Sequence, residues 1–124
     1  MVSVELLIPY IGPSTNSIYA GIHWQKRKKH KSDALKALKL LGFIPKIDAP
    51  VQITMTPMLG KGKRAYDVSN YSYTYKMLED CLVECGVLVG DTSKTVKRVL
   101  FESPVKISGK ESFAKLAIET ISDN

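Results

Sequence analysis

The sequence is poor in cysteine and has no long apolar run, and each shortage excludes a class of protein. Its 124 residues include only two cysteines, Cys81 and Cys85, too few to complete a zinc site. Four positions apart, they share one face of a helix, and we expect both to be buried as small apolar residues. No segment approaches the roughly 18 apolar residues that a membrane span needs. Residues 1–7 lack the basic start and cleavage site of a signal peptide, so we expect a cytoplasmic protein with no membrane partner.

Acidic residues are scarce in the first half of the chain. Residues 1–66 hold 11 Lys and Arg but 3 Asp and Glu, whereas residues 67–124 hold 7 and 9 respectively. The net charge of +6 therefore combines +8 in the first half with −2 in the second. A basic half followed by acidic groups suits a protein that binds a polyanion and also needs a cation. The alternative is a solvated, lysine-rich surface.

Hydrophobic periodicity predicts four strands and two helices. Alternating apolar residues indicate strands at 2–8, 51–56 and 113–121, the second of them ended near Pro57, and the apolar residues of 96–101 suggest one more. Three-four spacing indicates one helix from an N-cap at Ser32 to residue 41, and another at 70–85 capped by Gly86. Glu79 and Glu84 are expected on the solvent side of the second helix. We therefore expect residues 1–124 to form a single α+β domain, with a small mixed β-sheet packed on two helices.

Loops and cations separate these elements. Residues 10–24 have loop composition and carry the rings of Tyr10, Tyr19, His23 and Trp24, which either stack on bases or pin the loop to the core. We favour pinning. A basic run follows, made of Lys26, Arg27, Lys28, Lys29, His30 and Lys31. Its like charges repel one another, so we expect the run to be mobile until it faces phosphates. The alternative is a solvated segment that leads into a helix. A second basic turn holds Lys61, Lys63 and Arg64.

Two carboxylates, Asp67 and Asp91, stand at the two ends of the helix expected at 70–85. In a cationic protein this arrangement points to a divalent metal acting on a phosphate backbone, although Asp67 also suits a helix cap and Asp91 a turn. A helix of about 16 residues spans about 24 Å, so the carboxylates meet only if the chain folds back or a second subunit supplies one. Lys76, four residues before Asp80, forms either a surface ion pair or an ammonium beside a metal-bound phosphate.

This stretch resembles the signature of the RusA-like endodeoxyribonucleases, the Holliday junction resolvases common in phages and prophages. The similar positions are Asp67-x-Ser69-Asn70, Lys76, Asp80-x-Leu82, Gly86 and Asp91-Thr92. Near the start, Pro13-Ser14-Thr15-Asn16 followed by Tyr19 is similar to a loop of the same family. Ser69 stands where the family usually has a second aspartate.

The resemblance implies a RusA-like homodimer that nicks four-way DNA junctions in recombination and repair, in the cytoplasm of a phage or bacterial host cell. Asp67 and Asp91 correspond to the first and last catalytic aspartates, and Lys76 to the essential lysine. Mg²⁺ or Mn²⁺ would lie on Asp67 and Asp91, with Ser69 or Asn70 filling part of the shell. Branched DNA would be held by Asn16 and by the basic residues Lys26, Arg27, Lys28, Lys29, Lys31, Lys61, Lys63 and Arg64.

Two other functions fit the same residues. One is a dimer of the same fold that binds junctions but is catalytically weakened or inactive, because one carboxylate is replaced by Ser69. The other is a basic partner for an acidic protein, in which the aspartates only cap helices.

Overall fold

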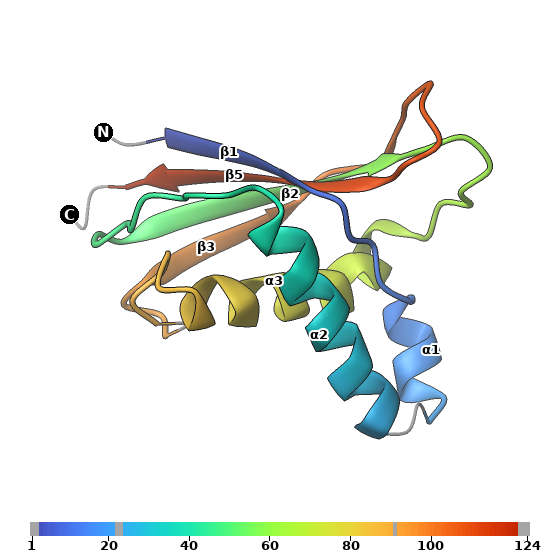
Figure 1. Ribbon diagram of the computed structural model, residues 1–124, viewed down its shortest axis with the longest axis horizontal. Helices are drawn as coiled ribbons and strands as arrows, with labels where there is room; N and C mark the ends of the chain where they lie inside the picture. Colours follow the sequence, from blue (N-terminus) through green and yellow to red (C-terminus); the bar gives the residue numbers. More distant parts are fainter. Residues whose placement is uncertain (1–2, 22–23, 91, 122–124) are drawn as a thin grey trace.

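One mixed sheet carries all the helices on a single face (Figure 1). The computed structural model describes residues 3–21, 24–90 and 92–121. The strands are β1 (Ser3–Ile8), β2 (Val51–Leu59), β3 (Val96–Phe101), β4 (Val105–Lys106) and β5 (Phe113–Thr120). The helices are α1 (Thr15–Tyr19), α2 (Trp24–Lys39), the 3-10 helix η1 (Val68–Tyr71) and α3 (Ser72–Glu84). The expected α+β class with a mixed sheet is confirmed, and no helix of these ranges has the length and apolar character to cross a bilayer.

The sheet has the order β1–β5–β2–β3, with β4 paired to the end of β2. The strand β5 is antiparallel to both of its neighbours, and β2 is parallel to β3 and β4. The predicted end of the second strand at Pro57 was wrong, because β2 continues to Leu59. Pro57 lies level with the gap between β3, which pairs up to Met55, and β4, which begins opposite Met58. Its missing N–H therefore removes no hydrogen bond that either strand requires.

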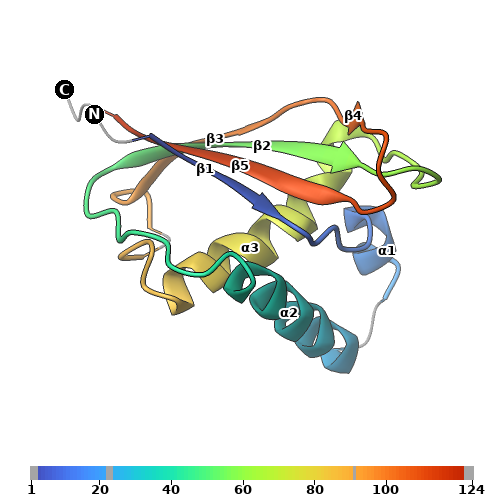
Figure 2. The same cartoon turned by 45° about the horizontal axis from the view of Figure 1, so that its top comes forward.

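The core lies between the sheet and the two longer helices. Alternate residues of β2 and β5 point toward the helices, and Ile53 pairs with Ile118 in the register of these strands. Leu78 and Leu82 of α3 and Leu38 of α2 meet them, and all of these side chains are almost fully buried. Figure 2 shows α2 and α3 crossing beneath the same face of the sheet. Each such side chain contributes about 1.5–3 kcal/mol on burial, so this layer fixes α3 against the sheet.

The helix α2 begins eight residues before the expected N-cap at Ser32, so it includes the basic run. Partners outside the run explain the difference. Lys29 Nζ lies 2.9 Å from Asp33 Oδ2, and Lys31 Nζ lies 3.5 Å from Glu84 Oε2 of α3. These pairs relieve part of the repulsion that the sequence alone suggests.

The segment expected to be a loop at residues 10–24 contains the short helix α1, which Ser14 caps by accepting a hydrogen bond from Ser17 N. Tyr10 is partly buried, as pinning requires, but Tyr19 is 85% exposed, so pinning was wrong for that residue. His23 and the side chain of Trp24 lie outside the described residues. Of the two cysteines, Cys81 is buried as expected, whereas Cys85 is exposed because it follows the last turn of α3.

Candidate functional site at the start of α3

Asp67 is an exposed residue immediately before η1. Its backbone is extended, with φ −61° and ψ 149°, and its carbonyl accepts a hydrogen bond from Asn70 N at 2.9 Å. Its carboxylate makes no capping hydrogen bond to η1. The Asp67 side chain therefore does not act as a helix cap. The residue is exposed to solvent just before η1 and α3.

Asn70 joins the acidic segment to the early loop. Its Oδ1 accepts a hydrogen bond from Asn16 N at 3.1 Å, across 54 positions of sequence, and its carbonyl accepts one from Thr15 Oγ1 at 3.2 Å. The structure thus brings Asn16, Ser69, Asn70 and Asp67 to one place. Ser69 is exposed, so a cation or a phosphate can approach its hydroxyl.

The early loop is fixed to the first turn of α3 by further hydrogen bonds that the sequence did not reveal. Thr15 Oγ1 lies 2.7 Å from Ser72 Oγ and accepts a hydrogen bond from Tyr73 N at 3.1 Å. Gly12 N donates to the buried Thr74 Oγ1 at 2.9 Å. Hydroxyl side chains on α3 therefore satisfy backbone and side-chain groups of the loop, and these hydrogen bonds add to the packing of Ile11 against the core.

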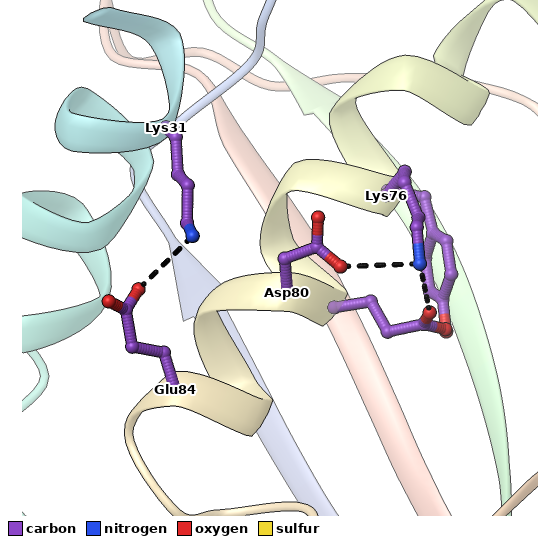
Figure 3. Close-up of polar contacts among 6 residues, drawn as sticks. Lys31, Lys76, Asp80 and Glu84 are labelled. Atoms are coloured by element: carbon purple, nitrogen blue, oxygen red, sulfur yellow. Dashed lines mark hydrogen bonds and ion pairs between the residues drawn. The ribbon is translucent and has the colours of Figure 1, made fainter. Parts of the chain in front are cut away.

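Lys76 lies one turn further along α3, between two acids (Figure 3). Its Nζ is 3.2 Å from Glu79 Oε1 and 3.2 Å from Asp80 Oδ1, so the ion pair with Asp80, one of the two alternatives for Lys76, is present. Both Lys76, with its side chain 54% exposed, and Asp80, at 35%, remain in contact with solvent, where such pairs contribute only a few tenths of a kcal/mol. The ammonium is therefore held in one region but can exchange partners.

Glu79 was expected on the solvent side of α3, and this was wrong, because only 6% of the residue is exposed. Tyr75, one turn before it, donates a hydrogen bond from Oη to Glu79 Oε2 at 2.5 Å. The Tyr75 ring packs edge-on against Phe101 of β3, with centroids 5.6 Å apart. Burial raises the pKa of Tyr75, and the hydrogen bond to Glu79 acts in the same direction, so the phenol keeps the proton that it donates.

Tyr75→Phe should lower the free energy of unfolding by about 1–3 kcal/mol, because the buried Glu79 Oε2 loses its donor and only the Lys76 hydrogen bond to Oε1 remains. Urea denaturation measures this change. Tyr19→Phe removes the same hydroxyl from an exposed ring and should leave stability almost unchanged. Equal effects of the two substitutions would show that the Tyr75–Glu79 hydrogen bond does not stabilise the fold.

Asp91 lies outside the described residues. Its neighbours Gly90 and Thr92 belong to the connection between α3 and β3, at the opposite end of α3 from Asp67 (Figure 1). This connection stays there, since Val87 N bonds to Leu82 O and Val96 N bonds to Thr92 O. The helix has 13 residues, and such a helix spans about 20 Å. Within residues 3–21, 24–90 and 92–121, no group of three or more His, Cys, Asp and Glu side chains is placed to hold a metal ion.

The expected DNA-binding cations lie in two places. Lys26, Arg27, Lys28 and Lys29 are exposed on the first half of α2, and Lys31 is half-exposed beside Glu84. Lys61 and Arg64 are exposed in the turn after β2, with Lys63 partly buried. The ring of Tyr19, at the end of α1, is exposed, so its face is open to stacking.

His30 differs from the lysines around it. Its Nδ1 lies 2.9 Å from Tyr73 Oη, which joins α2 to the first turn of α3. Burial lowers the pKa of His30, the charges of Lys29 and Lys26 act in the same direction, and Asp33 opposes them. The fold therefore favours the neutral ring.

Stability should fall as the pH decreases through the unfolded-state pKa of histidine, about 6.5, because unfolded chains then bind a proton that the folded state resists. Urea denaturation of the wild type at pH 7.5 and 5.5 should show this loss, and His30→Gln should show a smaller one. Identical losses in both proteins would mean that other groups cause the pH dependence.

Comparison with known proteins identifies no family for this chain. No family model matches it, and no curated protein matches it. The RusA-like assignment of Asp67, Ser69, Asn70, Lys76 and Asp91 therefore stays a prediction from the sequence.

Proposed function

We propose that the chain is a divalent-metal-dependent DNA endonuclease of the RusA type, which nicks four-way junctions by hydrolysing phosphodiester bonds. The strongest support is the hydrogen bond from Asn16 N to Asn70 Oδ1, because it joins the two separate motif segments beside the exposed Asp67. Two segments that share no sequence proximity are thereby held at one solvent-facing position near cationic surfaces. A resolvase needs such a combination of acidic oxygens and phosphate-binding cations.

The oxygen atoms at the start of α3 suit Mg²⁺ or Mn²⁺, which prefer hard donors. Asp67 supplies a carboxylate and Ser69 a hydroxyl, while Asn70 Oδ1 keeps one lone pair beyond the one that Asn16 N uses. A bound divalent ion would polarise the phosphate and acidify an attacking water. Lys76 would offset negative charge on the phosphate once it leaves the weak pair with Asp80.

One carboxylate is a weak set for a hard cation, so the site needs a second. We propose that Asp91 of the partner subunit in a homodimer supplies it, because Gly90 and Thr92 lie beyond the far end of α3. A two-fold axis would then produce two equal sites, each built from both subunits. Paired nicks across a junction follow from that symmetry.

A second candidate function is a junction-binding dimer that does not cut. The observation that favours it is the exposed hydroxyl of Ser69 where a carboxylate is expected, together with the lack of a three-residue metal-binding group in the described ranges. The cationic surfaces serve binding equally well in both functions.

One assay tests the proposal. The protein is incubated with a synthetic four-way junction and with linear duplex of the same sequence, with Mg²⁺, with Mn²⁺ and without metal. Metal-dependent nicking of the junction supports the nuclease. Tight junction binding without nicking in either metal supports the second function, and equal weak binding to both DNAs contradicts both.

A further inference from the structure

Two loops run together beyond the end of β2, at residues 60–66 and 107–112 (Figures 1 and 2). Ile107 N donates to Leu59 O at 2.9 Å, and Lys61 N donates to Gly109 O at 2.7 Å. Gly60 N also donates to Ser112 Oγ at 2.9 Å. With β4, these loops form one projection, here called the basic arm: residues 59–66 and 105–112.

The two loops of the basic arm touch through their backbones. A Cβ atom built on Gly60 would lie 2.3 Å from Lys110 O and 2.8 Å from Glu111 O, which leaves no room for any side chain at that position. Gly62 has a φ of +84°, which makes the tight turn between the two halves of the first loop. The basic arm is therefore fixed by close backbone contact.

The basic arm gathers five cations from distant parts of the sequence: Lys61, Lys63, Arg64, Lys106 and Lys110. Glu111 is its only acidic residue. Lys106 Nζ donates to Lys63 O at 2.6 Å and keeps two further protons for an anion. Lys63 Nζ lies 5.5 Å from the centroid of the Tyr66 ring. Four of the five cations are exposed, and the arm holds a single carboxylate. The basic arm therefore carries a concentrated positive charge.

The basic arm leads directly into the candidate site. Tyr66, its last residue, precedes Asp67 in the chain. Two hydrogen bonds hold Tyr66 in place. Tyr66 N donates to Tyr71 Oη at 3.0 Å, and Tyr66 Oη donates to Gly12 O at 3.2 Å. The arm and the carboxylate are therefore positioned by the same anchor.

We infer that the basic arm binds the phosphate backbone of a duplex DNA arm beside Asp67, an inference that rests on the proposed nuclease function. Cations spread over two exposed loops suit a row of phosphates better than a single anion. They carry no base-reading geometry, so the contact gives affinity and orientation without sequence preference. Lys106 and Lys110 thereby join the DNA-binding residues.

The double substitution Lys106→Gln/Lys110→Gln tests the charges of the basic arm. Binding to a four-way junction is measured without metal between 50 and 200 mM salt. The slope of log K against log salt should become shallower by about 2, because two phosphate contacts are lost. Lys36→Gln/Lys46→Gln removes the same charge from exposed positions outside the arm and should leave the slope unchanged. Equal slopes for the two double variants would overturn the inference.

Gly60→Ala tests the geometry of the basic arm without a change of charge. Its methyl group must displace the Lys110 backbone, so junction affinity should fall by about tenfold, as expected when one or more phosphate contacts are lost. Gly109→Ala is the matched control, since its added Cβ meets no atom within 4 Å. Unchanged affinity for both variants would contradict the inference. If the wild type does not bind the junction, the proposed function fails. If the wild type binds and the arm variants bind in the same way as the wild type, only the inference about the basic arm fails.

Discussion

Asp67→Asn should abolish junction nicking while junction binding and folding persist. The carboxylate is exposed and caps no helix, so an amide of the same shape disturbs no hydrogen bond of the fold. It removes a charged oxygen that a hard cation prefers. A metal Lewis acid contributes several kcal/mol to such a reaction, and 1.4 kcal/mol corresponds to tenfold, so the nicking rate should fall by about a thousandfold.

Single-turnover nicking with Mg²⁺ measures the rate, and a gel shift without metal measures binding. Asp48→Asn is a suitable control, because it removes one exposed acid from the loop before β2. Nicking by Asp67→Asn at the wild-type rate would contradict the assignment of this residue.

The same variant tells whether one subunit or two form the site. Asp67→Asn and Asp91→Asn are each expected to be inactive alone. In a mixed dimer, a site built from both subunits leaves one of the two positions with both carboxylates intact. Mixing the two inactive proteins should therefore restore nicking, whereas sites formed within single subunits would stay inactive in every mixture.

The sheet was predictable from the sequence because its pattern is local. Alternating apolar residues located β1 and β5 within a residue or two, the apolar content of 96–101 located β3, and Gly86, with a φ of +77°, ends α3 as its position suggested. The two-residue β4 escaped prediction because it has too few residues to show a period.

The errors concern groups whose environment depends on tertiary contacts. Helical spacing placed Glu79 on the solvent side of α3 but did not reveal that the Tyr75 ring, packed against Phe101 of β3, donates a hydrogen bond to it. The basic run was placed outside the helix because Glu84 and Tyr73, which contact Lys31 and His30, stand more than 40 positions away.

The candidate site was predictable as a set of residue types and not as a geometry. Its motif located Asp67 and Asn70, but no local pattern indicates that Asn16 N bonds to Asn70. The same limit hid Lys106, which reaches the basic arm through the pairing of β4 with β2 and its hydrogen bond to Lys63 O, and Lys110, whose backbone contacts Gly60. Long-range hydrogen bonds thus determine which chemically suitable residues act together.

Ser69→Asp should increase the affinity of the site for the metal ion and leave the fold intact. Ser69 is exposed within η1, so a carboxylate at this position displaces no packed side chain. It also stands in the first turn before α3, where a negative charge is favourable to the helix dipole. A second charged oxygen beside Asp67 should lower the Mg²⁺ concentration needed for half-maximal nicking by about tenfold or more, because hard cations are bound chiefly by carboxylates.

Nicking of the junction over a series of Mg²⁺ and Mn²⁺ concentrations measures this shift, with Ser69→Asn as the uncharged control. If the wild type only binds junctions, Ser69→Asp should create metal-dependent nicking in a protein that otherwise lacks it. An unchanged metal requirement in Ser69→Asp, with Asp67 intact, would mean that position 69 does not face the cation. The response to Ser69→Asp therefore distinguishes a weakened nuclease from a protein of the same fold that only binds DNA.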